Sequence, residues 1–163
     1  MKDKRDYLST SLEHAIAKTL ENMTFEEVII IDNDDVVRRV PKSDLLWARL
    51  PVHEPYKGFL ALEVPAEYGR LIAEEVYGEV QTEISEALIL DALAEISNTI
   101  AGRFLDELVP SDRAFVLGLP ETGKGEVPGA VKRVRSIQMN VGQHYLTAFV
   151  VGDDFEKVKS INS

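Results

Sequence analysis

Three polar side chains and a glycine are spaced to lie on one face of a single helix. The segment Gln81 to Leu108 has helical periodicity, and at about 100° per residue the offsets of four, three and four bring Asp91, Glu95, Asn98 and Gly102 into one line. Carboxylates accept hydrogen bonds and pair with basic groups, whereas a side-chain amide both donates and accepts. We call these four residues the polar stripe, and its chemistry is that of binding and positioning through hydrogen bonds.

The polar stripe is poorly explained by helix stability. Asp91 and Glu95 repel each other one turn apart, and no Lys or Arg occurs between Leu71 and Gly102. Asn98 and Gly102 are each roughly 0.5–1 kcal/mol worse than Ala inside a helix. A bland alternative stays open at this point, namely a solvated helix face on which Gly102 makes room for a neighbouring backbone.

The opposite side of the same segment predicts burial against a sheet. Five apolar residues fall within a narrow sector at helical spacing: Ile89, Leu93, Ile96, Ile100 and Phe104. The segment is therefore expected to be a long helix with one buried side and one polar stripe.

The sequence DALAEISNTIAG resembles the signature helix of the CheX/CheC family of chemotaxis phosphatases. That signature is Asp or Ser, three residues, Glu, two residues, Asn, and then a small residue or Gly, and the polar stripe matches it position by position. Looser similarity extends to most of the chain, including ENMTFEEV and the loop LGLPETGKGEVPG followed by two strands. Some members carry the signature twice. Here Glu13 is followed by Ile16 and Glu21 by Thr24, so the chain resembles the CheX-like branch with one site.

The resemblance implies an enzyme acting on another protein. The substrate would be the aspartyl phosphate of a CheY-like response-regulator receiver domain, which carries its own Mg²⁺, so no cofactor or metal of this chain is expected. Asn98 would orient the attacking water, and Glu95 would pair with a basic residue of the receiver. Asp91 would support docking, and Gly102 would let the partner's backbone come close.

Two other classes of function stay open from the sequence alone. The chain could be a non-catalytic CheX-like module that binds a receiver, or a flagellar or signalling partner, through the same stripe. It could also be a purely structural α+β subunit whose acidic helix gives solubility and an interface.

Composition limits the partners and the compartment. With 163 residues, one domain spanning residues 1–163 is expected, and a formal charge of −10 argues against nucleic acid or an anionic membrane as partner. The chain has no Cys, the segment after Met1 lacks the apolar core of a secretory signal, and no apolar run could span a membrane. A cytoplasmic protein is expected.

The remaining pattern predicts an α+β fold with helices packed on one face of a largely antiparallel sheet, as in the CheC-like fold. Helices are expected from about Ser9 to Met23, capped by Ser9 or Ser11, and after Pro65 as far as Gly78. Strands are expected at Glu27 to Asp32, Val36 to Val40, Leu45 to Val52, Gly58 to Val64, Arg113 to Leu119, Val131 to Val141 and His144 to Val151.

Three further expectations concern edges and ends. Pro51 and Pro55 predict that their hairpin lies near a sheet edge. Family members commonly pair through the sheet, which suggests a homodimer through an edge such as the Val36 or His144 segment. The polar tail from Asp153 to Ser163 is expected to fray.

For the other candidate sites, a structural role is a better interpretation than a functional one. Gly118 to Gly125 nearly matches a P-loop, but it lacks the final Ser or Thr and does not open a helix, so a flexible surface loop is expected. The three histidines, His14, His53 and His144, have no metal-ligand spacing, and Ser85 and Ser97 have no adjacent base. Trp47 and Phe59 are expected in the core.

Overall fold

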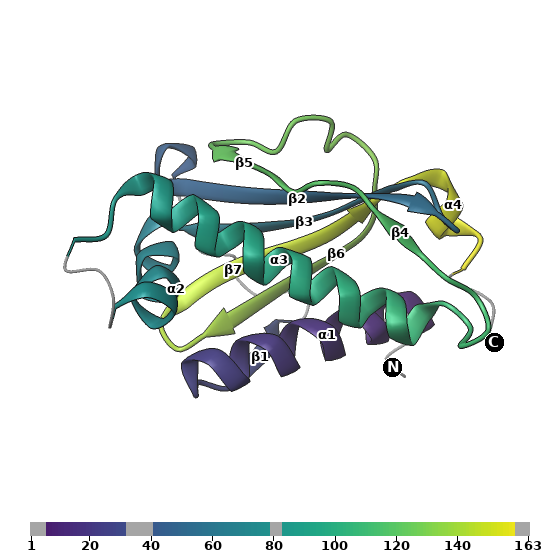
Figure 1. Ribbon diagram of the computed structural model, residues 1–163, viewed down its shortest axis with the longest axis horizontal. Coiled ribbons are helices and arrows are strands. Elements are labelled where there is room, and N and C mark those ends of the chain that lie inside the picture. The colour runs from purple at the N-terminus through teal and green to yellow at the C-terminus, as the bar shows by residue number, and fades with distance from the viewer. Residues whose placement is uncertain (1–5, 32–40, 79–82, 159–163) are drawn as a thin grey trace.

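The computed structural model describes residues 6–31, 41–78 and 83–158 (Figure 1). The elements are α1 (Tyr7–Thr24), β1 (Val28–Ile31), the 3-10 turn η1 (Lys42–Asp44), β2 (Leu45–Glu54), β3 (Gly58–Pro65), α2 (Ala66–Tyr77), α3 (Glu86–Leu108), β4 (Val116–Leu117), β5 (Glu121–Lys124), β6 (Arg133–Val141), β7 (His144–Val151) and α4 (Asp153–Glu156). Both predicted hairpins, β2–β3 and β6–β7, are present. None of the described helices is long and apolar enough to cross a membrane.

The strands form one antiparallel sheet in the order β1-β6-β7-β3-β2-β4, and β5 also pairs with β2. The register puts Leu50 opposite Leu60 and Leu62 opposite Ala148, so alternate apolar residues point to the same face. Chain segments distant in sequence therefore create one continuous apolar surface for the helices.

The three long helices cover one face of this sheet, with α3 lying across β2 and β3 and α1 packed beside α3 over β6 (Figure 1). Leu12, Ile16 and Phe104 are fully buried in the shared core. On the opposite face, Trp47, Ala61 and Phe149 form a smaller cluster that Val127 helps to cover, with Phe59 packed against it. The predicted α+β architecture and the core position of Trp47 are confirmed, whereas Phe59 is only partly buried.

The N-terminal end of α1 corrects one prediction. The cap is Asp6, whose Oδ1 accepts the Ser9 N–H at 2.8 Å, while Ser9 and Ser11 are both buried within the helix. The guanidinium of Arg135 also pairs with the Asp6 carboxylate. Burial alone would raise the pKa of this carboxyl, but the hydrogen bonds from Ser9 and Arg135 outweigh it and lower the pKa below its ordinary value.

The prediction that Pro51 and Pro55 place their hairpin near a sheet edge is confirmed, because only the short strands β4 and β5 lie beyond β2. On the outer side, β5 pairs with β2 as far as Arg49, and β4 pairs with it from Val52. Pro51 lies between these two stretches, and its carbonyl accepts the Gly118 N–H at 2.7 Å. Since the N and C=O of a strand residue point to the same side, the missing donor of Pro51 faces this break in pairing.

Several predicted boundaries change for similar tertiary reasons. The predicted strand Arg113 to Leu119 is only Val116–Leu117, and the predicted loop Pro120 to Gly129 contains β5. β7 pairs with both β6 and β3, so the His144 segment is no free edge for a homodimer. The Val36 to Val40 prediction lies outside the described residues, and β1 pairs with β6 instead.

The polar tail is anchored where the structure describes it. Phe155 in α4 is fully buried, with its ring centroid 5.6 Å from that of Tyr56 and 6.1 Å from that of Phe104, and Val158 is also buried. The prediction that the tail frays from Asp153 was therefore wrong for residues 153–158.

Candidate functional site

Helix α3 positions the polar stripe. It begins after Ser85, whose Oγ accepts the Leu88 N–H at 3.2 Å, and the start of the helix is tied to β5 by an ion pair of 2.7 Å between Glu86 and Lys124. The five residues of the predicted apolar sector, Ile89, Leu93, Ile96, Ile100 and Phe104, are all buried. Gln81 and Thr82, at the start of the predicted helix, lie outside the described residues.

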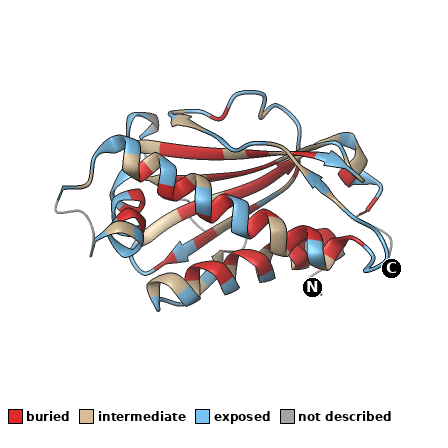
Figure 2. Cartoon of the chain, viewed as in Figure 1, coloured by how far each residue is buried: buried red, intermediate tan, exposed pale blue. Residues whose placement is uncertain are grey.

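The polar stripe faces solvent on the outer side of α3. Asp91, Glu95 and Asn98 are exposed and Gly102 is partly exposed. Figure 2 shows exposed positions along the outward side of this helix. With a rise of about 1.5 Å per residue, the four positions extend over about 16 Å of helix. Within the described residues, the side chains of Asp91, Glu95 and Asn98 make no hydrogen bond or ion pair. Their polar atoms are therefore free to bind an external partner.

Packing of the described residues does not require a glycine at position 102. A Cβ built at this position meets nothing within 4 Å. At Gly123, by contrast, a Cβ would lie 2.6 Å from Cζ2 of Trp47, so packing requires that glycine. The alternative in which Gly102 makes room for a neighbouring backbone of its own chain therefore fails, although the solvated face itself is present.

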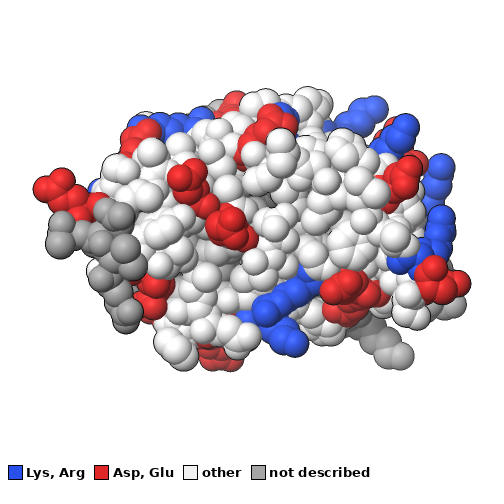
Figure 3. Space-filling model, viewed as in Figure 1, with Lys and Arg blue, Asp and Glu red and all other residues white. Residues whose placement is uncertain are grey.

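The stripe is a ridge on the surface, with acidic side chains gathered over the first half of α3 (Figure 3). A convex surface cannot by itself exclude water or surround a small substrate, as an enclosed site does. Its polar groups can act only when a partner supplies the complementary pocket. The geometry thus suits a helix that inserts side chains into a site on another macromolecule.

The other candidate residues from the sequence, namely the histidines, the segment similar to a P-loop and the serines, contribute to the structure. His14 Nδ1 lies 2.9 Å from Glu107 Oε1, and the ring of His144 lies 5.3 Å from that of Tyr68. No group of three potential metal ligands gathers in the described part of the chain. Gly123 and Lys124, from the segment that nearly matches a P-loop, lie in β5 and pair with β2, not at the start of a helix. Ser97 is buried.

Two basic residues near the stripe were not predicted from the sequence to be functional. Arg103 follows Gly102 directly and Lys18 comes from α1, and both line one cavity between α1 and α3. A signal for Arg103 existed, since it is the first basic residue after the long stretch without Lys or Arg. Lys18 had no local signal, because only the packing of α1 on α3 brings it there.

Solved structures with the same fold are numerous, but their sequences differ widely from this one. Chemotaxis protein CheX from Desulfovibrio desulfuricans has a TM-score of 0.71 and 16% identity, covering 90% of this chain and 99% of that one. A CheX–CheY–BeF₃–Mg²⁺ complex from Borrelia burgdorferi gives 0.67 and 16%, covering 91% and 98%. The FliM middle domain from H. pylori gives 0.60 and 11%, covering 94% and 92%. At these identities the likeness establishes the CheC-like fold alone.

Sequence comparison places the chain in a family. None of the proteins with curated functions matches it significantly. The family model described as chemotaxis phosphatase CheX matches residues 47–138, more than half of the 163 residues, and this range contains the whole polar stripe. The chain belongs to the chemotaxis phosphatase CheX family.

Proposed function

We propose that this protein hydrolyses the aspartyl phosphate of a CheY-like response-regulator receiver domain. The observation that carries the proposal is the pair Glu95 and Asn98, exposed and without partners in the described chain, on the outward ridge of α3. The family's description as a chemotaxis phosphatase supports a hydrolase. The structural neighbour in complex with CheY, BeF₃ and Mg²⁺ supports a receiver as the partner.

In the proposed reaction Asn98 positions water. Its amide carbonyl accepts a hydrogen bond from the water and its NH₂ donates to an oxygen of the phosphoryl group. The water oxygen attacks phosphorus while the bond from phosphorus to the aspartate oxygen breaks, which yields inorganic phosphate and a free carboxylate on the receiver. Phosphoryl transfer depends mainly on positioning and charge stabilisation, so one oriented amide is a sufficient contribution from this chain.

Glu95 fixes where that amide lies. It is one turn from Asn98 on the same ridge, about 4.5 Å along the axis. Its carboxylate is proposed to pair with a basic side chain of the receiver, and such charge-assisted hydrogen bonds are both strong and directional. Asp91, further toward the start of α3, adds negative charge for docking, and Gly102 lets the receiver's backbone approach the helix. The divalent ion of the reaction is expected to belong to the receiver.

The experiment is phosphate release from a phosphorylated receiver with and without this protein. Candidate receivers from the same cell are labelled with ³²P-phosphate, and loss of label is followed over time. Acceleration by the wild type and not by Asn98→Ala supports the phosphatase. Tight binding without acceleration would instead favour the non-catalytic module, and neither binding nor turnover with any receiver would overturn the proposal.

A further inference from the structure

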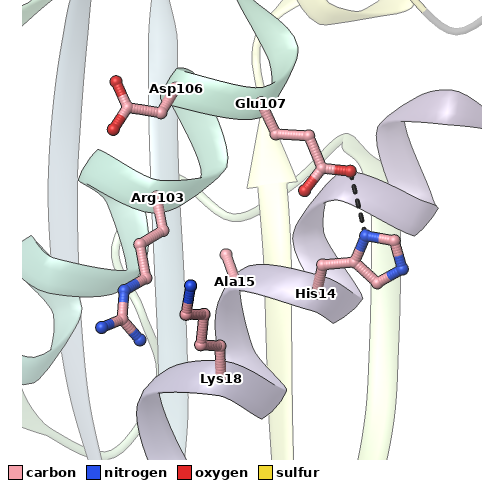
Figure 4. Close-up of a pocket in the computed structure, with 6 residues that line it drawn as sticks. All are labelled: His14, Ala15, Lys18, Arg103, Asp106 and Glu107. Atoms are coloured by element: carbon pink, nitrogen blue, oxygen red, sulfur yellow. Dashed lines mark hydrogen bonds and ion pairs between the residues drawn. The ribbon is translucent and has the colours of Figure 1, made fainter.

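A cavity of about 350 Å³ opens between α1 and α3, beside the end of the polar stripe. Figure 4 shows its lining, with Lys18 and Arg103 on one side and the paired His14 and Glu107 on the other. Ala15 lies between the two groups and Asp106 completes the rim. The cavity thus brings two cations from different helices to one place.

Arg103 is held in position by α1. Its Nη1 donates to Oγ1 of Thr19 at 3.1 Å, and that hydroxyl donates in turn to the Ala15 carbonyl at 2.8 Å. Thr19 is 5% exposed, so its hydroxyl is fixed by the helix core. A guanidinium that is fixed before binding loses less side-chain entropy when it meets a carboxylate.

Neither cation has an ion-pair partner among the described residues. In the described part of the structure no carboxylate lies within ion-pair distance of Lys18 or Arg103, although the protein carries a formal charge of −10. Glu107 is directed to His14 and lies on the far side of Ala15 (Figure 4). The basic side of this cavity therefore presents two cations without an ion-pair partner among the described residues, in a protein that is strongly acidic.

The pair lies toward the C-terminal end of α3 from the proposed catalytic residue, about 140° around the helix from it. Arg103 follows Asn98 by five residues, about 7.5 Å along the helix axis. Acidic side chains lie over the first half of α3, while both basic and acidic side chains lie at the groove between α3 and α1 (Figure 3). A partner that docks over Asn98 and extends past Gly102 toward α1 can reach this groove.

We propose that Lys18 and Arg103 form a second docking point that binds a surface carboxylate of the receiver, which rests on the proposed function of the stripe. Glu95 then contacts a basic group of the receiver and the basic pair contacts an acidic one. Two contacts of opposite sign on either side of Asn98 allow one orientation of the partner and penalise the reversed one.

A protein carboxylate fits this cavity better than free phosphate. The two cations share the lining with Asp106 and Glu107, so the formal charge of the whole lining is near zero and a dianion gains little. A single carboxylate delivered by a docked protein needs to meet only the basic side. It also adds no separate cost of immobilising a free ion, because the receiver is already bound through the stripe.

The test compares two double variants that remove the same charge. Lys18→Gln/Arg103→Gln removes the basic pair, while Lys132→Gln/Lys157→Gln removes two exposed cations that do not line this cavity. Binding of the BeF₃-activated receiver with Mg²⁺ is measured at low and high salt, together with kcat and KM for the phosphorylated receiver. Thermal melts check that all variants are folded.

The proposal expects Lys18→Gln/Arg103→Gln to raise Kd and KM about tenfold at low salt, with kcat close to wild type, a weaker salt dependence and no change in the control. Arg103→Glu should bind worse still and should regain affinity with one receiver in which a surface acid is replaced by Arg. Equal binding by wild type and Lys18→Gln/Arg103→Gln overturns the inference and leaves the phosphatase proposal intact. The inference is also overturned if Lys18→Gln/Arg103→Gln changes the binding of inorganic phosphate but leaves the binding of the receiver unchanged. Absence of binding and turnover by the wild type would instead refute the proposed function itself.

Discussion

Asn98 lies one turn beyond Glu95 on the outward ridge of α3, and neither side chain makes a hydrogen bond or ion pair with another described residue. A polar pair that stabilised the fold would be expected to have partners within the chain, since unpaired groups gain nothing from folding. The stability of the protein should therefore be nearly indifferent to both side chains. Their effects should appear in turnover and in binding, and in different proportions.

Asn98→Ala should lower turnover by orders of magnitude while changing receiver affinity little, because the change removes the oriented water and leaves the other docking residues in place. The melting temperature should be unchanged or slightly higher, since Ala is the better helix former. Single-turnover decay of a phosphorylated receiver measures the first effect, and calorimetry measures the second. Thr99→Ala, which also changes an exposed side chain next to the site, is the control. A destabilised Asn98→Ala protein with full activity would place this residue in a structural role.

Glu95→Ala should weaken binding as well as turnover. The lost charge-assisted contact with the receiver is worth about 1.5–3 kcal/mol, or roughly ten- to a hundredfold in Kd. Relief of the repulsion between Asp91 and Glu95 should leave the fold intact or slightly more stable. Titration calorimetry with the BeF₃-activated receiver gives the affinity. An unchanged Kd combined with lost turnover would assign Glu95 to the chemical step and not to docking.

Gly102→Ala separates partner contact from fold stability in one substitution. The new Cβ has open space around it in the described chain and the helix interior gains a better former, so the free energy of unfolding should rise by about 0.5–1 kcal/mol. The same methyl group should obstruct the receiver's backbone and weaken binding. Denaturant unfolding and receiver binding are measured on one preparation. Higher stability with undiminished affinity would show that no partner comes close at this position.

The sequence analysis succeeded where the information is local. Helical periodicity identified both the buried sector and the exposed stripe of α3, because both depend only on spacing along one element. It failed where a distant segment decides. β5 pairs with β2 where Gly123 packs closely against the ring of Trp47, and Lys18 joins Arg103 only through the packing of α1 on α3. Pro51 correctly indicated a nearby edge, but the break between β5 and β4 could not be predicted from the sequence of β2.

The cap of α1 illustrates the same limit. Asp6, Ser9 and Ser11 all belong to residue types that favour N-caps, so local preference did not distinguish them. The choice is made by Arg135, 129 residues away in sequence, whose Nε donates to Asp6 Oδ2 at 2.7 Å. The Asp6 side chain is 13% exposed, and a contact of this kind can stabilise the folded state measurably.

Asp6 therefore gives a prediction about pH. Because the hydrogen bonds of Ser9 and Arg135 outweigh burial and lower the folded pKa of this carboxyl, its contribution to stability is complete above the unfolded pKa and is lost as pH falls through the folded pKa. Asp6→Asn keeps a cap oxygen and loses the charge, so it should be less stable than wild type at pH 7 and should converge with it in acid. Asp6→Ala, which also loses the cap, should cost about 1 kcal/mol more at neutral pH. Denaturant unfolding at pH 7, 5 and 3 measures these differences, with Asp112→Asn as an exposed control. A gap between wild type and Asp6→Asn that stayed constant down to pH 3 would mean that the pairing with Arg135 does not stabilise the fold.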